Sequence, residues 1–145
     1  MNIECRAKTW DVNLVNVVDK YSAVPFKWGE HDCCLFACRA YDSVMGTAIT
    51  NRHLGEYDDA LSAMRHLKSQ GYYDLYDAAL GETCGMPQSP YLSSRGDIIF
   101  LPVSEQYPIG CLGVCMGHLC VFAGIVGLVN IPLDSLPVQS RSFRI

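Results

Sequence analysis

The residue best suited to chemistry is Cys33, which directly follows Asp32 at the predicted start of a helix. Gly29 interrupts any preceding element, and the carboxylate of Asp32 can accept the free backbone N–H groups of a first helical turn. A thiol there lies at the positive end of the helix dipole, which favours the thiolate and lowers the thiol pKa. Cys33 is therefore the candidate catalytic nucleophile. The alternative interpretation is that Cys33, Cys34 and Cys38 are small side chains that pack the core.

The elements that must position this thiol follow from the spacing of apolar residues. Positions 33, 36, 37, 40, 41 and 44 fall on one helical face, which predicts a buried central helix from Cys33 to about Met45, ended by Gly46. Three more helices are predicted at residues 9–23, 58–70 and 72–80, the last closed by Gly81. Residues 82–94 are predicted to form a loop.

From Gly96 onward the sequence changes to short β-rich runs separated by proline and glycine. Strands are predicted at residues 98–101, 111–116, 119–123, 128–133 and 139–145, with a turn at Gly117-His118. Helices first and strands later predict an α+β fold, in which an antiparallel sheet packs on the central helix. A chain of 145 residues has the length of one domain, so we expect residues 1–145 to form a single unit.

Two motifs resemble those of NlpC-like peptidases, which are papain-fold enzymes. Trp28-Gly29 followed by Asp32-Cys33-Cys34-Leu35-Phe36 resembles their nucleophile motif, and Arg95 to Phe100 resembles the Gly-Asp-hydrophobic run with which the family enters its sheet. The resemblance implies a papain-like (NlpC-type) fold, with N-terminal helices packed on a C-terminal antiparallel sheet. It also implies a histidine on a later strand that faces Cys33.

Three further segments resemble a compact version of this family that is encoded among bacteriophage tail genes: residues 110–117, residues 127–129 and the C-terminal Ser-Phe-Arg-Ile. This resemblance implies a protein made in the cytoplasm of a bacterial host and incorporated into the virion. Its partners would be other tail tip or hub proteins, and contact with peptidoglycan is a further expectation.

The family's catalytic histidine is missing from its expected place. Alignment of Cys111-Leu112-Gly113-Val114-Cys115 with the family's histidine-containing strand puts Cys111 where the imidazole should be. A thiol cannot act as a general base for another thiol as imidazole does near neutral pH. His118 is a weak substitute, because it lies about 23 Å farther along an extended strand. His31 is weaker still, since it precedes the helix. We therefore expect the peptidase chemistry to be lost.

The cysteines also suggest a zinc or iron–sulfur site built from Cys111, Cys115 and Cys120, completed by Cys33, Cys34 or His118. Cys111 and Cys115 would share a strand face about 13 Å apart, whereas two thiolates on one zinc lie about 4 Å apart. No Cys-x-x-Cys pair occurs in the chain. We thus expect no metal and no cofactor, and predict that these thiols fill a tight interface between sheet and helix.

Bulk properties limit the remaining possibilities. A net charge of -4 without a basic run argues against nucleic acid as a partner. Residues 111–129 are apolar enough to suggest a membrane span, but their four glycines favour a buried hairpin, so we expect no stable membrane insertion. The eight cysteines are predicted to be reduced, because no apolar signal region opens the chain. Three hypotheses remain: a noncatalytic tail component, an active cysteine peptidase or amidase on peptidoglycan, and a metal-binding adaptor.

Overall fold

The fold is known from a computed structural model, which describes residues 6–145. Its helices are α1 (Trp10–Tyr21), α2 (Cys33–Met45), α3 (Ala60–Ser69) and α4 (Leu75–Thr83), with short 3-10 turns at Ile49–Arg52, Pro90–Leu92 and Leu133–Ser135. Its strands are β1 (Pro87–Gln88), β2 (Ile98–Leu101), β3 (Cys111–Cys115), β4 (Leu119–Gly124), β5 (Gly127–Pro132) and β6 (Arg141–Phe143). The mixed α+β class is thus confirmed.

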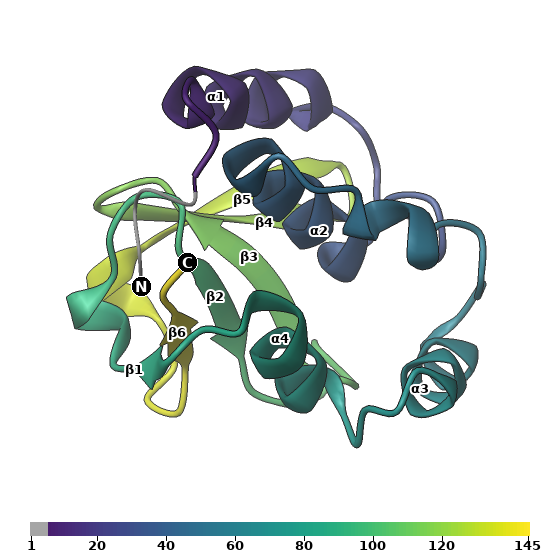
Figure 1. Ribbon diagram of the computed structural model, residues 1–145. Coiled ribbons are helices and arrows are strands. Elements are labelled where there is room, and N and C mark those ends of the chain that lie inside the picture. Colours follow the sequence, from purple (N-terminus) through teal and green to yellow (C-terminus); the bar gives the residue numbers. More distant parts are fainter. Residues whose placement is uncertain (1–5) are drawn as a thin grey trace.

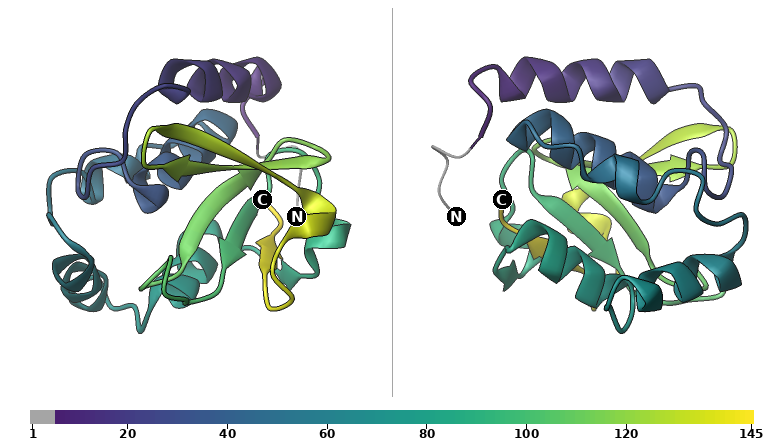
Figure 2. Two further views of the ribbon diagram at one scale, coloured as in Figure 1. Left: turned by 180° about the vertical axis from the view of Figure 1, so that it is seen from behind. Right: turned by 45° about the vertical axis from the view of Figure 1, so that its right-hand side comes forward.

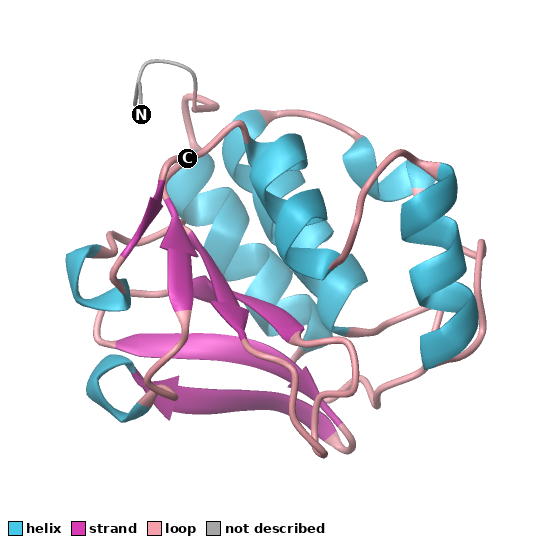
Figure 3. Ribbon diagram, turned by 90° about the horizontal axis from the view of Figure 1, so that it is seen from below, coloured by secondary structure: helices cyan, strands magenta, loops and turns pink. Residues whose placement is uncertain are grey.

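The six strands form one antiparallel sheet in the order β1-β6-β2-β3-β4-β5. The α-helices gather on one side of the molecule, whereas the sheet and the 3-10 turns at Pro90–Leu92 and Leu133–Ser135 lie on the other (Figure 3). Helix α2 lies between α1 and the central strands β3 and β4, and α4 packs beside β2 and β6 (Figure 1). In the view from behind and in the view turned by 45°, α1 lies at the outside of the molecule (Figure 2). The central position predicted for α2 is therefore confirmed.

Both ends of α2 follow the predicted local chemistry. Asp32 caps the helix, accepting the N–H of Leu35 at 2.8 Å, and Gly46 ends it in the left-handed conformation with φ of 72°. Only glycine adopts that conformation without steric cost. The predicted apolar face is buried along its whole length, from Cys33 at the first position to Val44 in the last turn.

The structure corrects the prediction for the fourth helix. Helix α4 starts later than predicted, after the cap Asp74. Gly81 does not end it, because the helix continues through Gly81 to Thr83. A Cβ atom on Gly81 would come within 2.7 Å of the ring of Tyr72, so this glycine makes room for an aromatic side chain. The segment predicted as a loop at residues 82–94 also contains the short strand β1 and a 3-10 turn.

The strand predictions hold to within a few residues, and the turn at Gly117-His118 lies between β3 and β4 as predicted. The apolar run at residues 111–129 forms parts of three strands of the sheet. Within residues 6–145, no helix is both long enough and apolar enough to cross a membrane.

Candidate functional site

The start of α2 is fixed by a tight loop held from both sides. Lys27 and His31 exchange two backbone hydrogen bonds, each of 2.8 Å. The fully buried carboxylate of Asp32 accepts the N–H of Gly29 at 2.9 Å as well as that of Leu35. One side chain thus joins the loop to the first helical turn, and the position of Cys33 is set by both.

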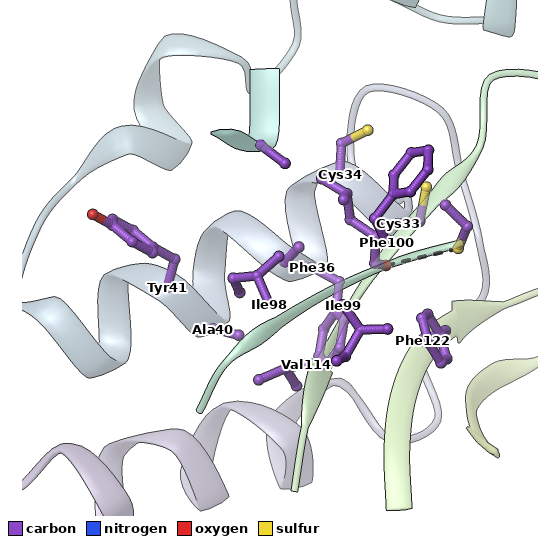
Figure 4. Close-up of a cluster of buried hydrophobic side chains, with 14 of the residues drawn as sticks. Cys33, Cys34, Phe36, Ala40, Tyr41, Ile98, Ile99, Phe100, Val114 and Phe122 are labelled. Atoms are coloured by element: carbon purple, nitrogen blue, oxygen red, sulfur yellow. Dashed lines mark hydrogen bonds between the residues drawn. The ribbon is translucent and has the colours of Figure 1, made fainter. Parts of the chain in front are cut away.

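Cys33 is enclosed, with only 4% of its surface exposed. Hydrogen bonds from the thiols of Cys111 and Cys34, together with backbone N–H groups of Leu112 and Cys34, lower the pKa of Cys33 well below its usual range, although burial acts in the opposite direction. The same interaction raises the pKa of Cys111. Cys33 and Cys34 stand at one end of a buried apolar cluster that includes Ile99 (Figure 4).

Cys111 is the residue that the structure brings to Cys33. It is the first residue of β3, is 1% exposed, and its Sγ also lies 3.7 Å from the carbonyl oxygen of Leu112. This is the place at which the sequence alignment expected a histidine in an active peptidase. The facing group is a second thiol, which cannot take the proton of Cys33 near neutral pH.

The histidines considered as substitutes do not reach Cys33. His118 is exposed in the turn after β3, at the opposite end of that strand from Cys111. His31 is buried, with its ring stacked on that of Tyr21 at 5.0 Å and its Nδ1 3.3 Å from Arg39. No hydrogen bond joins Cys33 to an imidazole anywhere in residues 6–145. His118, the candidate base, and Cys33, the candidate nucleophile, are thus separate.

A second polar cluster, which sequence reasoning missed, lines an apolar cavity between α2, α3 and α4. Nδ1 of His53 lies 2.8 Å from Nε2 of His66, and Nε2 of His53 lies 3.5 Å from Glu82. Glu82 in turn pairs with Arg52 at 2.6 Å. Burial is the main cause that lowers the pKa of His53. No sequence pattern links these residues, because they lie on three separate elements.

The Gly-Asp run at the start of β2 has a structural role. Asp97 is fully buried and accepts hydrogen bonds from the backbone N–H groups of Ser94 at 2.8 Å and Ile145 at 3.3 Å. Its carboxylate also pairs with Arg6 at 3.5 Å, and Arg6 donates to the carbonyl oxygen of Ile145 at 3.0 Å. This carboxylate therefore ties both ends of the described chain to the sheet.

The remaining cysteines show no site for a metal. All seven described cysteines are free, and no cluster of three or more metal-binding side chains occurs in the described part of the chain. Cys5 lies outside the described residues. Cys115 and Cys120 lie opposite each other on β3 and β4, at the other end of β3 from Cys111.

Fold and site together define an α+β domain built around a buried thiol at the start of its central helix. Residues 5–145 match a domain family of unknown function, DUF6950, and the chain belongs to that family. No curated protein and no solved structure matches the chain.

Proposed function

We propose that this chain is a noncatalytic domain of papain-like, NlpC type that serves as a structural component of a bacteriophage tail tip or hub. The proposal that the domain is noncatalytic depends on one observation, the contact between Cys33 and Cys111. A papain-like mechanism needs a base that removes the proton from the nucleophile and later returns it to the leaving group. The neighbour of Cys33 is a thiol whose own pKa is raised, so it does not serve as that base.

The papain-like part of the proposal is supported by the arrangement of the central elements. A cysteine at the first position of α2 meets the first residue of β3, and that strand follows the Gly-Asp run that opens β2. These are the relations that the resemblance to NlpC-like peptidases predicts. The extensive burial of the cysteines also suits a module retained for packing, because a small apolar thiol fills tight interfaces.

The role in the tail rests on the resemblance of the C-terminal half to the compact phage-encoded domains. Under this proposal the protein is made in the host cytoplasm, where its thiols stay reduced, and is then built into the virion beside other tail tip or hub proteins. The net charge of -4 argues against direct binding to packaged DNA.

The second candidate function is a cysteine peptidase or amidase that acts on peptidoglycan through Cys33. The observation that favours it is the lowered pKa of Cys33, since a thiolate is the nucleophilic form. The enclosed position of the thiol and the lack of a hydrogen-bonded imidazole place it second. The third hypothesis, a metal-binding adaptor, has no supporting observation in the described chain.

Genetic complementation in the phage tests the role in assembly. The gene is deleted from a phage that encodes this chain, and particles are examined by electron microscopy and protein mass spectrometry. The proposal predicts incomplete tails without the protein, and normal particles containing it after complementation with either wild type or Cys33→Ala. Normal, infectious particles from the deletion strain, with the protein absent from wild-type virions, would overturn it.

A further inference from the structure

The hairpin formed by β3 and β4 places two cysteines directly opposite each other. Cys115 ends β3, and Cys120 is its partner in the antiparallel register with β4. Both are fully buried, and both thiols are free. The pair lies at the other end of β3 from Cys111, the residue that faces Cys33, and the inference does not depend on the proposed function.

The backbone hydrogen bonds show which kind of cross-strand pair this is. The N–H of Cys115 donates to the carbonyl of Asp97 and its carbonyl accepts from Gly96, each at 2.8 Å, so both groups face β2. The next pair toward the turn, Met116 and Leu119, carries the hydrogen bond of 2.8 Å between the two arms of the hairpin. Cys115 and Cys120 are therefore a non-hydrogen-bonded pair.

That class of pair has the geometry that a disulfide requires. Directly opposed residues of this type have Cα atoms about 4.5 Å apart, closer than the pairs that exchange hydrogen bonds. Disulfides join Cα atoms about 4.4 to 6.8 Å apart and Cβ atoms about 3.5 to 4.5 Å apart. The bond can thus form without a change of strand register.

The chemistry of the two thiols also suits disulfide exchange. A hydrogen bond from Cys120 lowers the pKa of Cys115 to about 7, and the same contact raises the pKa of Cys120. An attacking thiol is most effective when its pKa lies near the ambient pH. The pair lies next to the turn formed by Gly117 and the exposed His118, separated from it by Met116 and Leu119. Local opening of this end of the hairpin would therefore give a small reagent access to the two thiols.

We propose that Cys115 and Cys120 form a reversible disulfide site that reacts with small-molecule disulfides such as oxidised glutathione. The Cys115 thiolate attacks one sulfur of the reagent, breaks its S–S bond and releases the first glutathione thiolate. The Cys120 thiolate then attacks the Cys115 sulfur of the mixed disulfide and releases the second. The reagent gains two electrons and the two protons that the cysteines lose, giving two molecules of glutathione and one protein disulfide.

Differential alkylation in mixtures of oxidised and reduced glutathione tests the site. Free thiols of the whole chain are blocked with N-ethylmaleimide in denaturant. One portion is digested without reduction, so that mass spectrometry distinguishes glutathione adducts from disulfide-linked peptides. In the other portion disulfides are reduced and labelled with iodoacetamide, and each cysteine is mapped by mass spectrometry. We expect Cys115 and Cys120 to acquire the second label together and with one midpoint, while the exposed Cys84 is modified only by glutathione. If both keep the first label under conditions that modify Cys84, or if either pairs with another cysteine, the proposal is wrong.

Variants then distinguish a paired site from independent oxidation. Cys33→Ala, the matched control, should leave the joint labelling of Cys115 and Cys120 unchanged. In Cys120→Ala, Cys115 should be found only as a thiol or as a glutathione adduct, never in an internal disulfide. Because the wild-type labelling is decisive alone, a failure of Cys120→Ala to fold would not affect the test. An internal disulfide on Cys115 in a folded Cys120→Ala protein would contradict the assignment.

Discussion

Cys111, at the first position of β3, faces Cys33, at the first position of α2, and its interaction with Cys33 lowers the pKa of the Cys33 thiol. The contact joins the start of the central helix to the first residue of a central strand. Donors around Cys33 favour its thiolate, yet none of them accepts a proton from it. The arrangement favours a thiolate at Cys33, and no imidazole of residues 6–145 is hydrogen-bonded to it.

The first prediction concerns Gly29, in the loop before α2. It has φ of +82°, and a Cβ atom there would overlap the backbone carbonyl of Tyr57. Gly29→Ala should destabilise the protein by about 3 kcal/mol or more, because the clash is with backbone that cannot move aside easily. The free energy of unfolding is measured by urea denaturation.

Gly55 provides the matched control for that variant. It has φ of +77° but nothing within 4 Å of a Cβ atom, so Gly55→Ala carries only the conformational cost of about 1–2 kcal/mol. The difference between the two variants isolates the contact with Tyr57. Equal losses of stability would show that Gly29 is needed for its φ angle alone.

The second prediction concerns the cap of α2. Asp32→Ala removes the acceptor of two buried N–H groups, those of Gly29 and Leu35, and should cost about 2–4 kcal/mol. Asp32→Asn keeps an oxygen acceptor and should cost less. Thermal and urea unfolding of both variants at neutral pH checks this order. A smaller loss in Asp32→Ala than in Asp32→Asn would contradict the capping role.

Comparison of wild type with Asp32→Asn also predicts how the stability contributed by Asp32 changes with pH. Burial raises the pKa of Asp32, so the folded state holds the proton to higher pH than the unfolded state, whose aspartate pKa is about 3.9. The stability of wild type relative to Asp32→Asn should therefore decline as pH rises from about 4 toward neutrality. A relative stability that increases over this range would show that the carboxylate is favoured by folding.

The third prediction concerns His31. Burial and the nearby charge of Arg39 lower its pKa, so on acidification the unfolded state takes up a proton that the folded state does not bind. Stability should fall as pH decreases through about 6.5, and His31→Gln should lose part of this dependence. His118→Gln, which changes an exposed turn residue, serves as the matched control variant. Identical slopes for wild type and His31→Gln would contradict the prediction.

Local sequence signals were sufficient to predict most helices and strands, and to place Cys33 at the first position of α2. The extent of α2 follows from the Asp32 cap, the apolar face and Gly46, and these signals lie within one segment. The end of α4 was not predictable, because Gly81 reads as a stop unless the ring of Tyr72 is known to pack against it. Such a contact is set by tertiary packing and overrides the local tendency of glycine to end helices.

The relations between distant residues were recovered only where a family motif supplied them. The alignment put Cys111 opposite Cys33, and the structure brings the two together. The pair of His53 and His66 had no such guide, because the residues lie on separate elements and neither is part of a periodic pattern. The opposition of Cys115 and Cys120 depends on strand register, which the sequence constrains through the position of the turn but does not fix.

The most direct test of the central claim is an assay of peptidoglycan cleavage by purified protein. Release of soluble fragments from purified peptidoglycan is followed for wild type and Cys33→Ala in a reducing buffer, beside a known cysteine endopeptidase as positive control. The account predicts that both proteins give the same release as buffer alone, because no imidazole within residues 6–145 is hydrogen-bonded to Cys33. Release by wild type that disappears in a folded Cys33→Ala protein would contradict the account and establish the chain as an enzyme.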